Sequence, residues 1–253
     1  MTSTPTDTPW IRRGHPAPPG AATLVCFPHA GGSATSFHAL SRTLSERLDV
    51  VAVQYPGRQD RHREPAIEDL RELADQTFEA LTEALGTERP LALFGHSMGA
   101  CVAFEVARRL EEKSGVEPMA LFVSGHRAPS RHRTENLHLK GDDALLREIR
   151  ALNGTAPQVL DDEDLVRLLL PSLRADYKAV ESYRAVQGAA VGCPVVALTG
   201  DADPKTSVEE ARAWREHTTG PFDLRVFTGG HFYVSEHTEA VADVLSRHLD
   251  RTE

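Results

Sequence analysis

The sequence lacks the features of a membrane, secreted or nucleic-acid-binding protein. It has 253 residues, 40% of them hydrophobic, but no apolar run approaches the roughly 18 to 20 residues that span a bilayer. The N-terminal segment has no apolar core of the kind found in secretory signals. The formal net charge of −9 argues against binding to nucleic acid or to anionic membranes. We therefore expect a cytoplasmic protein that contacts neither.

Patterns for metals, disulfides and nucleotide cofactors are also missing. Cysteine occurs three times, at Cys26, Cys101 and Cys193, and this odd number at wide spacing favours neither a disulfide framework nor a zinc site. Each cysteine lies in or beside an apolar run, so we predict small buried side chains in a reducing compartment. Neither the dinucleotide-binding nor the P-loop glycine pattern is present. We expect no metal and no cofactor.

Short apolar runs alternate with helical patterns along most of the chain. The runs at 23–27, 50–54, 91–94, 120–124, 195–199 and 224–227 predict strands, and helices are predicted at about 35–48, 67–85, 98–113, 208–217 and 236–250. The strands are almost continuously apolar, as expected for strands covered on both faces. The order predicts an α/β fold with a mostly parallel central sheet and helices on both faces.

One segment breaks this alternation. Between Ser124 and Val195 the sequence shows helical patterns at 142–152, 162–170 and 172–186, and we predict that Pro171 separates the last two. Apolar residues at helical spacing cross that break (Leu165, Leu169, Leu173, Tyr177 and Val180). We predict a helical lid insertion at 129–189, between core segments 21–128 and 190–253 and after an N-terminal arm at 1–20. The alternative is a set of helices that only extends the core.

The pentapeptide Gly95-His96-Ser97-Met98-Gly99 matches the Gly-x-Ser-x-Gly nucleophile elbow, between a predicted strand and a predicted helix. Such a turn holds the serine in a strained conformation and leaves no room for side chains two positions away, which explains the glycines. Ser97 is the predicted nucleophile. The alternative is a tight turn that contains a serine by chance.

A serine hydroxyl needs a base, and in this arrangement the acid and then the histidine follow the serine along the chain. His231 comes directly after the last predicted strand, whereas other late histidines fall in predicted helices (His217, His237 and His248). Asp201 and Asp203 both follow the strand that ends at 199. We prefer Asp203, because a short turn is needed before the carboxylate can face the histidine, and Asp201 remains the alternative.

An oxyanion hole needs two backbone N–H groups. Met98, directly after the nucleophile, is predicted to supply one. The loop Pro28-His29-Ala30-Gly31-Gly32 follows an early strand, and its paired glycines allow the main chain to approach a ligand closely. Ala30 is the predicted second donor. His29 precedes the serine in sequence, so we predict that it shapes this loop.

Taken in order, these segments resemble the type II thioesterases, free-standing α/β-hydrolases that accompany polyketide synthases and nonribosomal peptide synthetases. The resemblance covers nearly the whole chain and is carried by PWIRR, VCFPHAGGSATSF, VQYPGRQDRHREP, FGHSMGA, SGHRAP, LPSLRADYKAVESY, LTGDADP and GGHFYV. Carried over by position, the family's triad falls on Ser97, Asp203 and His231. Its oxyanion donors fall on Ala30 and Met98.

The resemblance implies hydrolysis of acyl thioesters on the phosphopantetheine arm of acyl or peptidyl carrier proteins, which clears stalled or wrongly primed synthases. It also implies a lid over an acyl channel, and we expect a monomer. Because carrier proteins are acidic, the arginine-rich segments 58–63 and 126–133 are candidate docking patches, or ordinary solvated charge. Two alternatives remain open: a carboxylesterase or lipase that cleaves oxygen esters, and a non-catalytic protein that binds carrier proteins.

Overall fold

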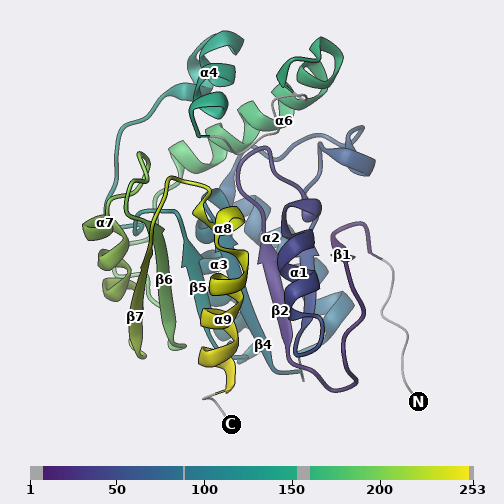
Figure 1. Cartoon of the computed structure of the whole chain (residues 1–253), viewed down its shortest axis with the longest axis vertical. Coiled ribbons are helices and arrows are strands. Elements are labelled where there is room, and N and C mark those ends of the chain that lie inside the picture. The colour runs from purple at the N-terminus through teal and green to yellow at the C-terminus, as the bar shows by residue number, and fades with distance from the viewer. Residues whose placement is uncertain (1–7, 88, 153–159, 251–253) are drawn as a thin grey trace.

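The computed structural model describes residues 8–87, 89–152 and 160–250, in which seven strands form one sheet (Figure 1). The strand order is β1-β3-β2-β4-β5-β6-β7, and every neighbouring pair is parallel except β1 with β3. The strands are β1 (Ile11–Arg13), β2 (Thr23–Phe27), β3 (Asp49–Val53), β4 (Leu91–His96), β5 (Leu121–Ser124), β6 (Val195–Gly200) and β7 (Phe222–Phe227). The predicted α/β architecture with a mostly parallel sheet is confirmed.

Helices cover both faces of the sheet (Figure 1). On one face lie α1 (His38–Leu44) and α9 (Thr238–Leu249), and on the other α2 (Leu70–Leu85) and α3 (Met98–Arg109). Shorter helical segments are α7 (Val208–Arg212), α8 (Tyr233–Glu236), η1 (Ala34–Phe37), η2 (Gln59–Arg61), η3 (Leu110–Ser114), η4 (Leu137–Leu139) and η5 (Ala213–His217). A hydrophobic core lies between the sheet and the helices on each face. Successive residues of a strand belong to the two cores alternately, because side chains of a strand alternate between faces.

The alternation is visible in β2. Leu24 and Cys26 pack with the α1 and α9 side, whereas Val25 and Phe27 pack with the α2 and α3 side. This double burial explains why the predicted strands read as continuous apolar runs. All three cysteines are buried and free, as predicted.

All six predicted strands are present, within two residues at each end, but β1 was not predicted. It lies in the segment interpreted as a loose N-terminal arm, where Ile11–Arg13 instead pairs antiparallel with β3 at the sheet edge. Three residues, two of them arginine, carry no periodic signal. Their position at the sheet edge comes from pairing with β3, a contact between segments distant in the sequence.

The lid prediction was wrong about Pro171. The segment α4 (Asp142–Leu152) matches its prediction, but α6 (Glu163–Ser182) runs through Pro171 without a break. Proline removes one backbone N–H, yet packing of one face can outweigh that loss. The hydroxyl of Ser172 donates to the carbonyl of Leu169 at 3.0 Å, which gives this turn an additional hydrogen bond.

The apolar stripe of α6 is shorter than predicted. Leu173 and Tyr177 pack against Leu145 and Ile149 of α4, whereas Leu165 is 43% exposed. In Figure 1, α4 and α6 lie above the end of the sheet at which β4 and β6 terminate. This position is the one expected of a lid. In the described part of the chain, no helix combines the length and apolarity that crossing a membrane requires.

The contact between α3 and the sheet generates a first prediction. A Cβ atom at Gly99 would lie 2.0 Å from the carbonyl oxygen of Phe27, so Gly99→Ala should lower the free energy of unfolding by about 3 kcal/mol. Gly141→Ala is the matched control, since a Cβ there meets no atom within 4 Å. Urea denaturation of both variants measures the difference. Equal stability of the two variants would contradict this account of the packing.

Candidate active site

The strand β4 ends in a strained turn at Ser97. Its φ of 54° and ψ of −122° fall in a region of backbone conformation that non-glycine residues rarely adopt. Among the described non-glycine residues, only Gln59 also has a positive φ. The N–H of Ser97 donates to the carbonyl of Ser124 at 2.7 Å, which ties the turn to β5. A Cβ at Gly95 would lie 2.1 Å from the carbonyl oxygen of Gly99, so the turn requires glycine. The motif therefore exposes the serine hydroxyl at the carboxyl edge of the sheet.

The structure brings Ser97, His231 and Asp203 together from three distant segments. The hydroxyl of Ser97 lies 3.0 Å from Nε2 of His231, and Nδ1 of His231 lies 3.0 and 2.9 Å from the two carboxylate oxygens of Asp203. A carboxylate only accepts hydrogen bonds, so Nδ1 carries the hydrogen and Nε2 is free to accept from the serine. This is the geometry of a nucleophile, a base and an orienting acid.

Asp203 and Asp201 have different roles in the loop after β6. Asp203 is buried, and one of its oxygens also accepts from the N–H of Lys205 at 2.8 Å. Asp201 is exposed, and its carboxylate accepts from the N–H of Gly229 at 2.9 Å. Asp201 therefore links two neighbouring loops and Asp203 faces the imidazole.

The two predicted oxyanion donors line the same pocket as Ser97 and His231. Met98 is the first residue of α3, and N–H groups at a helix N-terminus have no partner within the helix. In the loop after β2, the N–H of Gly31 donates to Asp176 at 2.7 Å and that of Gly32 to the carbonyl of His29 at 2.9 Å. These two donors are occupied, which leaves Ala30 as the loop's candidate.

Two further histidines, His96 and His29, lie in a row with His231. The ring centroid of His96 lies 5.3 Å from that of His231, and the ring of His29 lies 6.0 Å from that of His96. Burial, with a smaller electrostatic contribution from the neighbouring His231, lowers the pKa of His29 to about 3 and holds the pKa of His96 well below its usual range. Both rings are therefore neutral. A Cβ at Gly32 would lie 2.8 Å from the His29 ring, so this ring packs against the loop.

A second serine–histidine pair lies behind the first. Nδ1 of His96 is 2.9 Å from the hydroxyl of Ser124, which is itself 2.6 Å from the hydroxyl of Tyr233. All three residues are buried, and none of them lines the pocket of Ser97. The pair therefore belongs to the interior and packs beneath His231.

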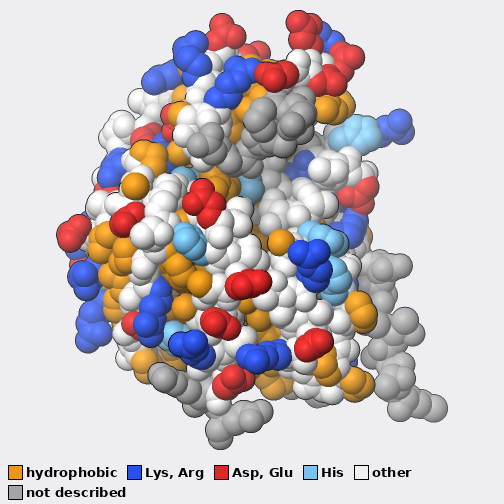
Figure 2. Space-filling view, viewed as in Figure 1, with side chains coloured by type: hydrophobic (Ala, Val, Ile, Leu, Met, Phe, Trp, Pro, Cys, Tyr) orange, Lys and Arg blue, Asp and Glu red, His pale blue; other side chains and the backbone are white. Residues whose placement is uncertain are grey.

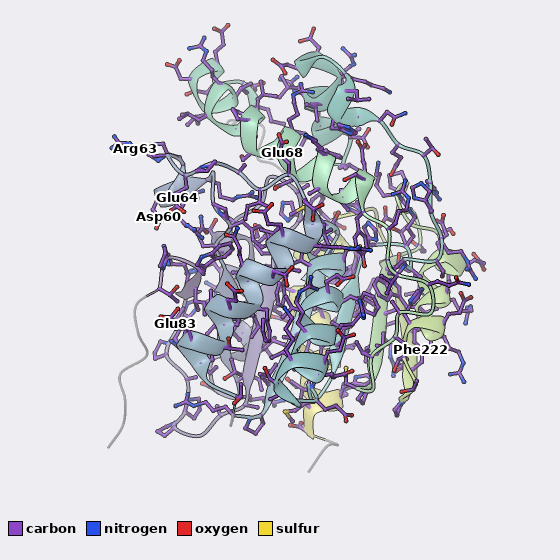
Figure 3. The ribbon with its side chains drawn as sticks, turned by 180° about the vertical axis from the view of Figure 1, so that it is seen from behind. Asp60, Arg63, Glu64, Glu68, Glu83 and Phe222 are labelled. Carbon is purple, nitrogen blue, oxygen red and sulfur yellow. The ribbon has the colours of Figure 1, made fainter. Side chains whose placement is uncertain are left out.

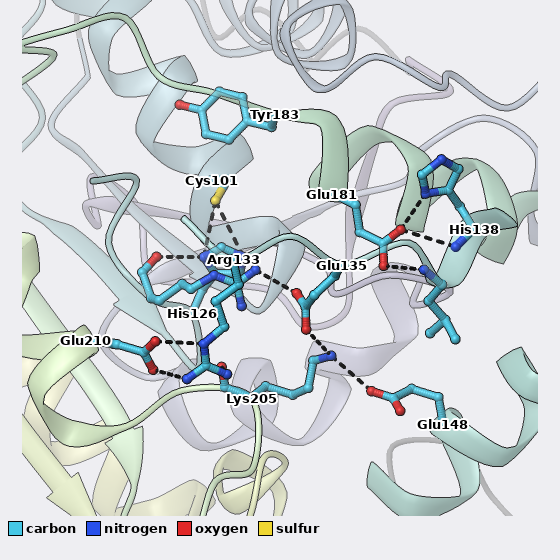
Figure 4. A network of polar contacts seen from close by, with 12 residues as sticks. Cys101, His126, Arg133, Glu135, His138, Glu148, Glu181, Tyr183, Lys205 and Glu210 are labelled. Carbon is cyan, nitrogen blue, oxygen red and sulfur yellow. Dashed lines mark hydrogen bonds and ion pairs between the residues drawn. The ribbon is translucent and has the colours of Figure 1, made fainter. Parts of the chain in front are cut away.

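Side chains of the insertion form the roof of the pocket: Leu152, Tyr177, Val180 and Glu181. Lys205, in the loop that carries Asp203, makes ion pairs of 2.9 Å with Glu135 and with Glu148 of α4 (Figure 4). Arg127 also pairs with Glu135 at 2.6 Å. Burial opposes ionisation of Glu135, but these cations outweigh it and lower its pKa to about 2. Sequence reasoning missed this network, because its members follow no spacing pattern.

The two arginine-rich segments are largely neutralised. Arg58 and Arg61 are buried, and Arg61 pairs with Glu64, which lies beside Asp60 and Arg63 in Figure 3. In the second segment the arginines pair with carboxylates: Arg127 with Glu135, Arg131 with Glu216 and Arg133 with Glu210. On the face shown in Figure 2, acidic and basic side chains are interspersed. The structure thus favours ordinary paired charge over a docking patch for most of these arginines.

Comparisons with known proteins agree with this geometry. A family model described as a thioesterase domain matches residues 22–249. A probable cadicidin biosynthesis thioesterase of Streptomyces griseus is 50% identical over 96% of this chain and 67% of its own length. Thioesterase PikA5 of Streptomyces venezuelae is 51% identical over 95% of this chain and 85% of its own. The solved structure of the type II thioesterase BorB from the borrelidin biosynthetic cluster has a TM-score of 0.88 at 53% identity, covering 95% of this chain and 97% of that one.

The two aspartates give a second prediction. Asp203→Asn should slow the reaction of Ser97 with a fluorophosphonate by about 10³ to 10⁴-fold, because an amide no longer selects the required tautomer of His231. Asp201→Asn is the matched control and should react within a few-fold of the wild type. Time courses of labelling read by mass spectrometry measure both rates. A larger loss in Asp201→Asn than in Asp203→Asn would reverse the assignment.

Proposed function

The chain belongs to the thioesterase family and has the α/β-hydrolase fold, and we propose that it is a type II thioesterase that releases acyl groups from carrier proteins. The observation that carries this proposal is the 3.0 Å contact between the Ser97 hydroxyl and Nε2 of His231, whose Nδ1 faces the Asp203 carboxylate. Its relatives are named for biosynthetic pathways or clusters. The proposed role is to remove stalled or wrong acyl groups in polyketide or nonribosomal peptide synthesis.

The proposed reaction begins with the acyl thioester in the pocket beneath α4 and α6. His231 takes the proton of Ser97 as the hydroxyl oxygen attacks the thioester carbonyl. Asp203 stabilises the imidazolium that forms, and the N–H groups of Ala30 and Met98 hold the oxyanion. Collapse of the tetrahedral intermediate breaks the carbon–sulfur bond, and His231 returns the proton to the departing thiol.

Hydrolysis of the acyl-serine completes the cycle. His231 takes a proton from water, which attacks the ester carbonyl through a second oxyanion intermediate, and Ser97 regains its proton as the acid leaves. A thiol is a good leaving group, so these steps need no metal and no cofactor. The lid function of residues 129–189, the monomeric state and the cytoplasmic location belong to the same proposal.

The alternatives fit less well. An oxygen esterase would use the same triad, but relatives that share half of this chain's residues are named thioesterases. A non-catalytic carrier-binding protein would have no use for a strained serine in contact with an oriented histidine. The partner of the proposed enzyme is the phosphopantetheine arm of an acyl or peptidyl carrier protein.

Replacement of the nucleophile tests the reaction. Ser97→Ala should leave acetyl, propionyl and longer acyl groups on carrier proteins, with at least about a 10³-fold loss of rate, because no other side chain supplies the nucleophile. Intact mass spectrometry of the carrier proteins follows the loss of each acyl group. Ser124→Ala is the matched control and should keep activity within several-fold. Equal inactivation of the two variants would point to the interior pair instead.

Leaving-group preference separates the thioesterase from the esterase. The wild type should hydrolyse an acyl-pantetheine thioester with a kcat/KM at least about 10-fold above that of the matching oxygen ester, given the better leaving group. Rates of acid release measured by chromatography provide the comparison. A kcat/KM that is higher for the oxygen ester would favour the esterase.

A further inference from the structure

Asp176 of α6 connects the lid to the loop that carries Ala30. Its carboxylate is buried, with 1% of the side chain exposed, and accepts from the N–H of Gly31 at 2.7 Å. Arg58 donates to both of its oxygens, at 2.7 and 2.8 Å, and also to the carbonyl of Gly32 at 3.1 Å. One carboxylate and one guanidinium therefore hold two successive residues of this loop.

Leu173, one turn before Asp176, presses on the same loop. Gly31 has a φ of +73°, and a Cβ added there would lie 2.8 Å from Cδ1 of Leu173. Ala30 packs against the cluster that Leu173 forms with α4. Two side chains on one face of α6 thus contact the loop, one by packing and one by hydrogen bonding.

These contacts fix the direction of the Ala30 N–H. The N–H of Gly32 donates to the carbonyl of His29 at 2.9 Å, which closes a turn over His29–Gly32. The carbonyl of His29 and the N–H of Ala30 belong to one planar trans peptide, so they point in opposite directions. When Asp176 and Arg58 hold Gly31 and Gly32, the turn holds the His29 carbonyl, and the Ala30 N–H is turned away from it.

A loop with two glycines needs such support, because glycine restricts the backbone least of all residues. Burial disfavours the charge of Arg58, but the charge and hydrogen bonds of Asp176 outweigh this and raise its pKa. The guanidinium is therefore charged inside the protein, and replacement of a buried ion pair by apolar side chains often costs little stability. The hydrogen bonds by which Asp176 and Arg58 hold the loop therefore explain the presence of this ion pair better than a contribution to stability does.

We infer that Asp176 is a positioning residue of the oxyanion hole, which acts through Gly31 and Arg58 to aim the Ala30 N–H at the developing oxyanion. The inference rests on the proposed function for the role of Ala30. It makes the lid helix α6 part of the catalytic geometry. An oxyanion donor stabilises the transition state more than the ground state, so the effect belongs to kcat.

The test replaces the pair with apolar side chains in the full chain. Arg58→Met combined with Asp176→Leu leaves no buried charge without a partner, so this double variant should fold, as a thermal unfolding transition will show. Its kcat for an acyl-pantetheine thioester should fall about 10²-fold with KM within about threefold, in the range found when one oxyanion donor is lost. Asp176→Asn, which keeps an acceptor for Gly31, should lose less.

The matched control is an ion pair on the same helix that does not touch the loop. Lys178, two residues after Asp176, pairs with Glu68, which is labelled in Figure 3. Glu68→Gln should keep kcat within about twofold of the wild type. A loss in this control equal to that of the double variant would show that any weakening of α6 has the same effect, and would overturn the inference.

A second measurement separates stabilisation of the oxyanion from binding of the acyl chain. The Ser97 oxygen adds to the carbonyl carbon of an acyl trifluoromethyl ketone, and the oxyanion that forms lies in the oxyanion hole. The matching thioether analogue binds without reaction. The double variant should bind the ketone about 10²-fold more weakly and the thioether equally well. Equal weakening of both ligands, or an unchanged kcat in the folded double variant, contradicts a positioning role. Failure of the wild type to cleave thioesters would refute the proposed function, while the ketone-to-thioether ratio would still test Asp176.

Discussion

The close approach of α3 to the ends of β2 and β4 is the constraint on which the rest of the structure depends. The helix starts so near the strands that only hydrogen fits at the α-carbons of Gly95 and Gly99. Ser97 therefore takes a positive φ, which points its side chain out of the sheet and leaves the N–H of Met98 at a helix N-terminus. A nucleophile and one oxyanion donor are produced by the same packing contact, so neither can be moved without the other.

Burial sets the electrostatics around that turn. The rings of His29 and His96 lie near His231, and burial keeps them neutral across physiological pH. An imidazolium at His231 therefore meets no positive neighbour among these rings, while the Asp203 carboxylate faces it at 2.9 Å. Neutral histidines provide dense polar packing without competing for the proton. His29 and His96 can therefore lie near the site while His231 acts as its base.

The insertion is joined to the core by charged groups at the catalytic loops. Asp176 of α6 holds the loop after β2 together with Arg58, and Glu148 of α4 pairs with Lys205 in the loop after β6. The backbone N–H of the same Lys205 orients Asp203. Loops that carry oxyanion and acid residues are therefore each in contact with the insertion. The insertion therefore helps to shape the site.

The sequence by itself determined the local features: the buried strands, the glycine-flanked serine, and the positions of Ala30, Met98, Asp203 and His231 after strands. Parallel strands end at one edge of the sheet, so residues that follow them can be predicted to converge. The tertiary structure alone decided the pairing of β1 with β3, the continuity of α6 through Pro171, the distinct partners of Asp201 and Asp203, and the pairing of Arg58 with Asp176. Periodicity records which face of an element is buried. It carries no information about which buried polar group, a hundred residues away, completes another's hydrogen bonds, because that depends on how the packed elements meet.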